Sequence, residues 1–154
     1  MHQHIVALLD ANQVHLAHRL ILAKYAPSCL LDNKRKELSG LLNYLSKSKS
    51  LLSEWERGGG VLLAYLELLD HFPQDDSPIP SLWGPEKVES AFKTCSGLLK
   101  IISQDISSTW KSVGVSVSCD ECELDLLTIS IQEMTMYLSS LSTHLNGLKV
   151  NHET

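Results

Sequence analysis

Apolar residues recur at intervals of three and four over most of the chain, which is the spacing of one face of an α-helix. No stretch alternates between apolar and polar residues for long enough to indicate a sheet, although 112–118 is strand-like by itself. The pattern therefore predicts an all-α protein, an antiparallel bundle of about five helices. A short α-solenoid is the alternative architecture, but no internal repeat of fixed length supports it.

The first part of the chain predicts two short helices. An apolar stripe near the N-terminus slips in phase after Asp10, which is expected to cap a second helix over 11–25. Pro27 should end that helix, because proline lacks the backbone N–H and its ring clashes with the preceding turn. Asp32 or Asn33 then stands where a side-chain cap would start the next helix.

That next helix carries its apolar residues in one continuous phase from Leu38 to Leu69, which indicates a collinear or gently broken helix pair. Three consecutive glycines, 58–60, interrupt the run and make it the weakest part of this helical stretch. A phosphate-binding loop would require a following Lys and Ser/Thr, which the sequence does not supply. The glycines are therefore expected to form a hinge or to let another helix cross close to the backbone.

Residues 71–85 hold four of the five prolines and predict a loop between an N-terminal helical half and a C-terminal hairpin of long helices. Pro85 is well placed as the first residue of the next helix, whose apolar stripe runs to Gly114, where it should stop. The last helix should start at Ser118, where Ser118 and Glu121 have the spacing of a capping box.

The last helix has an unbroken pattern of apolar residues at alternating spacings of three and four, as in a coiled-coil seam. Its members are Leu124, Leu127, Ile131, Met134, Leu138, Leu141, Leu145 and Leu148. From Met134 to Leu148 there is no Asp, Glu, Lys or Arg, whereas exposed helix faces normally carry Lys and Glu. This part of the helix is therefore expected to be central to the bundle or covered by a partner chain. The predicted partner-binding residues are Met136, Tyr137, Ser140, Thr143 and His144.

Length and charge narrow the class of protein. A chain of 154 residues suits a single domain covering 1–154. The formal net charge is −5, with eight Lys and Arg against five Asp and Glu in residues 1–60, and five against thirteen in residues 61–154. The chain as a whole has no basic excess of the kind that nucleic-acid binding requires, so nucleic acid is not the expected partner.

Two groups of residues are candidate metal sites. His15 and His18 lie three residues apart on one predicted helix face, but the Glu-x-x-His pattern of di-metal bundles does not occur. Cys119 and Cys122 form a C-x-x-C motif at a predicted helix start, where a thiol could bind zinc or take part in redox chemistry. Zinc usually requires a second pair, and the flanking carboxylates oppose thiolate formation. No metal or cofactor is therefore expected.

The sequence indicates only a class of function. There is no secretory leader pattern and no apolar stretch long enough to span a bilayer, so we expect an intracellular protein, cytoplasmic or nuclear, with reduced cysteines. No set of residues marks a catalytic site. The leading hypothesis is a non-enzymatic helical module that binds another protein, or a second copy of itself, through its long C-terminal helices. A helical bundle that binds a metal or a small molecule is the alternative.

Overall fold

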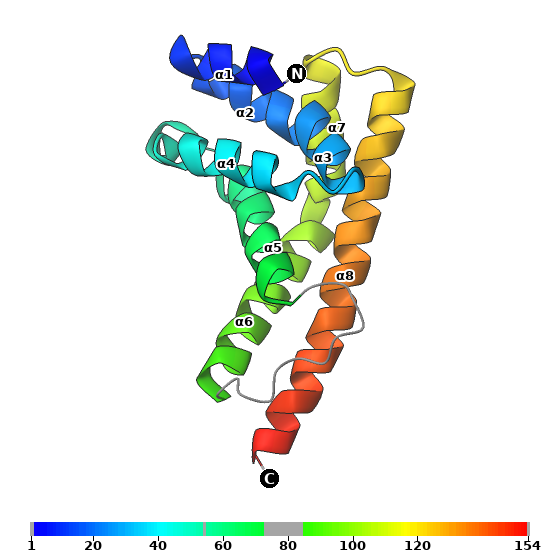
Figure 1. Ribbon diagram of the computed structural model, residues 1–154. Coiled ribbons are helices and arrows are strands. Elements are labelled where there is room, and N and C mark those ends of the chain that lie inside the picture. The colour runs from blue at the N-terminus through cyan, green and yellow to red at the C-terminus, as the bar shows by residue number, and fades with distance from the viewer. Residues whose placement is uncertain (1, 54, 73–84, 154) are drawn as a thin grey trace.

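The computed structural model describes residues 2–53, 55–72 and 85–153, and every regular element in these ranges is helical (Figure 1). The predicted all-α fold is therefore confirmed. The first half contains α1 (His2–Asp10), α2 (Val14–Leu20), the π-helical η1 (Ile21–Tyr25), α3 (Ala26–Leu31), α4 (Arg35–Ser46), the 3-10 turns η2 (Lys49–Leu51) and η3 (Trp55–Arg57), and α5 (Gly59–His71). The second half contains α6 (Pro85–Ile101), the π-helical η4 (Ile102–Ile106), α7 (Ser107–Ser116) and α8 (Glu121–Glu153).

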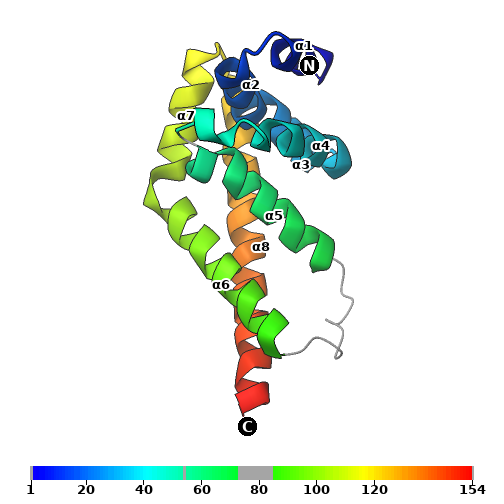
Figure 2. The ribbon, with the colours of Figure 1, turned by 90° about the vertical axis from the view of Figure 1, so that its left-hand side faces the viewer.

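The long helices form an antiparallel hairpin to which the other helices attach. The arm made of α6, η4 and α7 runs up one side, and α8 returns beside it (Figures 1 and 2). Helix α5 packs on α6, while η1 contacts α7, and α3 contacts α8. Most of the predicted loop, residues 73–84, lies outside the described residues, but Pro85 begins α6 as predicted.

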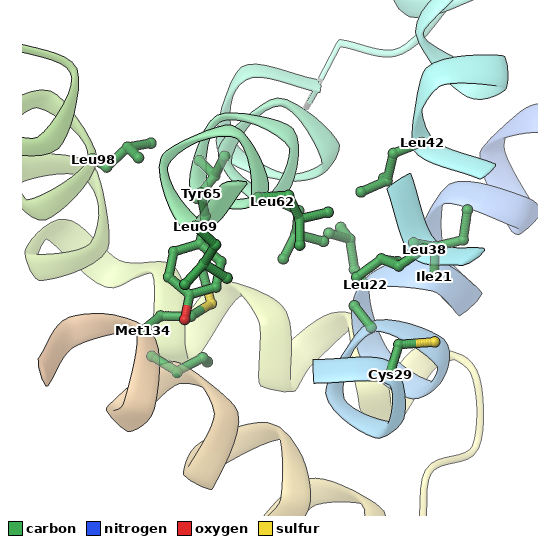
Figure 3. Close-up of a cluster of buried hydrophobic side chains, with 14 of the residues drawn as sticks. Ile21, Leu22, Cys29, Leu38, Leu42, Leu62, Tyr65, Leu69, Leu98 and Met134 are labelled. Carbon is green, nitrogen blue, oxygen red and sulfur yellow. The ribbon is translucent and has the colours of Figure 1, made fainter. Parts of the chain in front are cut away.

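Buried side chains from both halves of the chain form one hydrophobic core. Figure 3 shows part of it, where side chains of η1, α4, α5, α6 and α8 meet. The α8 stripe supplies six buried residues to this core, namely Leu127, Ile131, Met134, Leu138, Leu141 and Leu145. Its seam therefore faces the rest of this chain, as the heptad spacing predicts.

Proline 27 does not end a helix. The chain remains helical from Val14 to Leu31, because η1 widens the helix just before the proline. In this wider turn the Ala26 N–H donates to Ile21 O, five residues back. The carbonyl of Ala23, which would receive the missing proline N–H in an α-helix, instead has the Cys119 thiol as a weak donor at 3.9 Å.

Asn33 and Ser118, which the sequence predicts at helix starts, lie at helix ends in the structure, and so does Asn12. Helices α1, α3 and α7 each end in a Schellman motif, whose last residue adopts a left-handed backbone. The φ angles are 60° at Asn12, 60° at Asn33 and 62° at Ser118. The closing bonds run from Gln13 N–H to Leu8 O, from Lys34 N–H to Cys29 O and from Cys119 N–H to Gly114 O, at 2.8, 2.8 and 2.9 Å.

The predicted caps therefore change position. Asp10 is the last residue of α1, and neither Gln13 nor Lys34, at the starts of α2 and α4, makes a side-chain cap. The capping box of α8 lies two residues later than predicted, because Glu123 N–H donates to Asp120 Oδ1 at 2.8 Å and Asp120 N–H donates to Glu123 Oε1 at 3.2 Å. Helix α7 also continues past Gly114 to Ser116, and this buried glycine faces Leu124 of α8.

The prediction that α4 and α5 form a collinear or gently broken helix pair was wrong. Helix α4 ends at Ser46, and two 3-10 turns follow it. The axis of α5 then runs in a different direction from the axis of α4 (Figures 1 and 2). The connecting residues Leu52 and Trp55 are buried, so the in-phase apolar spacing reflects burial on both sides of a turn. Apolar spacing reports which face is buried and contains no information on the direction of a helix axis.

The triple glycine lies where other groups pass close to the backbone. A Cβ at Gly58 would stand 2.7 Å from His18 Nε2, and one at Gly59 would stand 2.3 Å from Trp55 Cζ3. The contact at Gly58 comes from α2 and agrees with the expected close approach of another helix, whereas the contact at Gly59 comes from the preceding turn, η3. Helix α5 thus begins at Gly59 in a position that a larger residue would not fit.

We predict opposite effects for two glycine-to-alanine changes. Gly59→Ala should lower the free energy of unfolding by about 1–3 kcal/mol, because the buried Trp55 ring must move. Gly97→Ala is the matched control in α6, where no atom of the described residues lies within 4 Å of the new Cβ, and it should raise stability by about 0.5–1 kcal/mol. Urea denaturation measures both. Equal effects of the two changes would contradict the close approach at Gly59.

Candidate functional site

A surface groove lies between the end of α6, η4 and the middle of α8. Its volume is about 800 Å³. The wall from α6 to α7 consists of Leu99, Lys100, Ile102, Ser103 and Ser107, and the α8 wall consists of Thr128, Ile131, Gln132, Thr135, Met136 and Ser139. The groove follows the two long helices that the sequence indicated as the binding part of the chain.

Local helix geometry and small side chains explain why the groove is open. The arm changes from α-helix to π-helix at Ile102–Ile106, and such single π-helical turns are frequent at functional sites. Ser103 and Ser107 line the groove on the side of the arm, and Thr128, Thr135 and Ser139 line it on the α8 side. None of these short side chains can fill the space that the core residues Ile102 and Ile131 leave at its base.

Most of the hydroxyl groups that line the groove donate hydrogen bonds to backbone carbonyls of their own helices. Thr128 Oγ1 donates to Leu124 O at 3.0 Å, and Thr135 Oγ1 donates to Ile131 O at 2.9 Å. On the opposite wall, Ser103 Oγ donates to Lys100 O at 2.9 Å. Threonines bound in this way turn their hydroxyls toward the backbone, so their methyl groups remain for contact with an occupant. The groove is therefore more apolar than its composition implies.

The predicted partner-binding residues fall into three places. Met136 lines the groove and is 72% exposed, the highest value among the exposed large apolar residues described. Ser140, Thr143 and His144 are exposed further along α8, outside the groove. Tyr137 is turned toward the core.

The inward position of Tyr137 has a structural function. Its hydroxyl donates to Leu68 O, in the last turns of α5, at 3.0 Å. The same hydroxyl also lies within hydrogen-bonding distance of Phe72 O. Its ring packs edge-on against Tyr65, with 5.5 Å between the ring centroids. Tyr137 therefore attaches α8 to α5, and we leave it out of the proposed binding surface.

Sequence reasoning did not identify the groove wall formed by α6 and η4. Ser103 and Ser107 are four residues apart and share a helix face, as do Thr128 and Thr135, seven apart. This spacing of small hydroxyl residues was the available signal on both helices. It does not by itself indicate that the two faces oppose each other.

The two candidate metal-binding histidines do not act together. His15 is exposed, whereas His18 is buried, with 4% of its surface exposed. His18 Nε2 accepts the Gly59 N–H at 3.0 Å, and its ring lies against Trp55 with 5.7 Å between centroids. The Nε2 nitrogen therefore already accepts a hydrogen bond within the fold.

His18 supplies the cap that the sequence around α5 lacks. The first N–H groups of a helix have no partner within the helix, and Gly58 at the cap position has no side chain to offer. Burial, followed by the charges of His15 and Arg19, lowers the pKa of His18 to about 4. A protonated ring would lose the acceptor and place a positive charge at the positive end of the α5 dipole.

Cys119 and Cys122 have different environments. Cys122 is exposed, while Cys119 is half-buried and its thiol is directed toward Ala23 O. Burial and the nearby Glu123 carboxylate raise the pKa of the Cys119 thiol, which opposes the thiolate that metal or redox chemistry needs. Within the described part of the chain, no group of three or more His, Cys, Asp or Glu residues could hold a metal ion.

A second, smaller cavity of about 480 Å³ lies where η1, α3 and the start of α4 meet α8. Its rim carries charges of both signs, and Lys24 Nζ stands 3.7 Å from Glu123 Oε2. Lys34 also lines it, so the basic start of α4 lies near the acidic start of α8 in the same chain.

The Tyr25 side chain also lines this cavity, and its buried hydroxyl has no hydrogen-bond partner among the described residues. Burial, and then the neighbouring Cys29 thiol, raises the pKa of Tyr25. The Cys29 thiol is only a weak hydrogen-bonding group, and its position relative to the Tyr25 hydroxyl does not allow a hydrogen bond.

Comparisons with known proteins give no relative. No protein-family model matches the chain, and no match was found among curated proteins or solved structures. Of the helices in the described ranges, none is both long enough and apolar enough to cross a membrane. A functional proposal must therefore rest on the geometry of the chain itself.

We predict a pH-dependent loss of stability that originates at His18. The ordinary pKa is 6.5 and the folded value is about 4, so the stabilisation is complete above pH 6.5 and is lost as the pH falls toward 4. At 1.36 kcal/mol per pKa unit, the loss totals about 3 kcal/mol. Urea denaturation at a series of pH values measures it.

His18→Gln provides the comparison for this prediction, because the amide oxygen is an acceptor that does not titrate in this range. In this variant the free energy of unfolding should fall less steeply between pH 6.5 and pH 4, because the contribution of His18 is removed. His15→Gln, at an exposed position, should keep it. If the free energy of unfolding of His18→Gln depended on pH as it does in the unmodified chain, the assignment of this effect to His18 would be wrong.

Tyr25→Phe should raise the free energy of unfolding by about 1 kcal/mol, because it removes a buried hydroxyl that none of the described residues pairs with. Tyr44→Phe, at a tyrosine that is half exposed, is the control and should have little effect. Both are measured by thermal and urea denaturation. A clear loss of stability in Tyr25→Phe would show that the hydroxyl has a partner in solution.

Proposed function

We propose that this chain is a non-enzymatic protein-interaction module, a subunit or folded segment of a larger assembly, which binds another protein through the groove between α6 and α8. The observation that carries the proposal is the apolar groove, whose Ser103, Thr128 and Thr135 hydroxyls are already satisfied and whose rim exposes Met136. Such a surface gains free energy when an apolar partner covers it and leaves few polar groups unpaired.

The composition of the groove favours binding over catalysis. Among the described residues that line it, there is no histidine, cysteine or carboxylate to act as a base or nucleophile. Lys100 is the one cation among the described lining residues, and the net charge of the chain is −5, so the groove offers no basic surface for nucleic acid. A protein partner, either different or a second copy of this chain, fits these properties best.

We also propose a reducing, intracellular location. The buried Cys95 thiol donates to Leu138 O at 3.0 Å, a contact that requires reduced sulfur and that joins α6 to α8. Burial raises the pKa of Cys95 to about 11, so the thiol stays protonated and unreactive.

A small-molecule-binding bundle is the second candidate, and the size of the groove is the observation that favours it. Pockets for small organic ligands have volumes of about 300–1,000 Å³ and mostly apolar walls. The groove lies within this range. Native mass spectrometry of the protein purified from its source would detect such a ligand and distinguish the two candidates.

The interaction can be tested with a photo-crosslinking residue in place of Met136. In an extract of the source cells, we expect one discrete protein adduct from position 136. Position 115 is the matched control, because Val115 is 67% exposed on α7 and does not line the groove. Equal labelling from both positions, or a bound small molecule without any protein adduct, would contradict the proposal.

The captured protein can then be purified and its affinity measured. Met136→Lys should weaken binding by about 1–3 kcal/mol, because the charge would have to be desolvated in the interface. The melting temperature should not change, since Met136 is exposed in the free chain. Val115→Lys should alter neither quantity, and an unchanged affinity of the Met136→Lys variant would exclude the groove as the binding site.

A further inference from the structure

The chemistry of the groove walls restricts the backbone conformation of an occupant. Both walls are helical, so the backbone groups of α6, η4 and the middle of α8 lie within helices rather than along a free sheet edge. The hydroxyls of Ser103, Thr128 and Thr135 are donated to carbonyls of these same helices. An extended peptide would find few partners here for its own N–H and C=O groups.

Each unpaired backbone group of an extended peptide would lose its hydrogen bonds to water without replacement. Peptides that bind in extended form normally pair with an exposed strand edge, and within the described ranges this chain has only helices. An α-helix satisfies its backbone internally and presents only side chains to the groove. The walls therefore select a helical occupant.

The length of the groove sets the size of that helix. Along α8 the wall extends from Thr128 to Ser139. At 1.5 Å per residue, this is roughly 16 Å, or about three helical turns. A helix of this length contacts a groove through apolar residues at positions i, i+3 or i+4, and i+7.

The charge of the groove gives the occupant a second property. Lys100 is the one charged residue among the described lining residues, and it is exposed. The structure records no ion pair between Lys100 and any described side chain. A carboxylate on the rim of the bound helix would complement this charge and fix the register of the helix.

We infer that the groove binds an amphipathic helix of about three turns from another protein, with its apolar stripe between α6 and α8 and an Asp or Glu beside Lys100. This inference rests on the proposed function and specifies the partner segment. The apolar stripe supplies most of the affinity. The carboxylate determines register and selectivity, because an exposed ion pair contributes little free energy.

A displayed library of helical peptides tests the inference without knowledge of the natural partner. The library carries random residues on a helix-favouring background and is selected against the full chain and against three variants, Lys100→Glu, Lys49→Glu and Met136→Lys. Lys49 is exposed on η2, so Lys49→Glu makes the same change in net charge away from the groove.

Peptides selected on the unmodified chain should carry the apolar stripe and favour Asp or Glu at one position. Selection on Lys100→Glu should keep the stripe and favour Lys or Arg at that same position, whereas Lys49→Glu should keep the acidic preference. A selected acidic peptide should bind Lys100→Glu about twofold to fivefold more weakly, as expected for an exposed ion pair. Met136→Lys should lose these peptides.

The possible failures are distinguishable. Helical peptides that depend on Met136 but show no acidic preference would overturn the inference about Lys100 and leave the proposed function intact. Peptides with apolar residues at every second position would overturn the helical occupant. Binding that Met136→Lys does not affect would overturn both the inference and the proposed function.

Discussion

The packing of α8 against the arm made of α6 and α7 is the contact on which the rest of the structure depends. Its buried stripe runs from Leu127 to Leu145, and the helices of the first half attach to the hairpin that this contact creates. Hydrogen bonds from the Cys95 thiol to Leu138 O and from Tyr137 to Leu68 O fix the register of α8 against its neighbours. One face of α8 is thereby committed to the core, and the groove proposed for binding borders that face, with Ile131 belonging to both.

Two π-helical segments interrupt the α-helices, one in the first half of the chain and one in the arm of the hairpin. In η1 the wider turn accommodates Pro27 without ending the helix, and Cys119 supplies a weak donor to the carbonyl that proline leaves without its usual partner. In η4 the same kind of turn lies in the wall of the groove. The turn in η1 therefore keeps a helix continuous, and the turn in η4 contributes to the shape of the candidate site.

Helix termini were the part of the fold that local sequence described least well. Asn33 and Ser118 are favourable residues at a helix start, yet in the structure both adopt left-handed backbone at a helix end. Asparagine suits either position, because its short polar side chain tolerates that conformation. At the start of α5 the cap comes from His18, 41 residues earlier in the chain, and no local pattern could have shown this.

The candidate site was predictable on one side only. The missing charges of α8 indicated a surface covered by other groups, and Met136 on that helix does line the groove. The same absence of charge also included Tyr137, whose ring faces α5, because composition does not distinguish an inward aromatic residue from an exposed one. The opposing wall depends on how α6 lies against α8, which is a property of the packed pair.

The sequence by itself determined the helical class, the start of α6 at Pro85 and the buried stripe of α8, because helix periodicity and apolar burial are local or nearly local properties. Only the tertiary structure decided the direction of α5, the cap that His18 provides and the groove beside Met136. Each of these requires residues distant in the chain to meet. Their meeting depends on the packing of the whole chain, to which every buried side chain contributes.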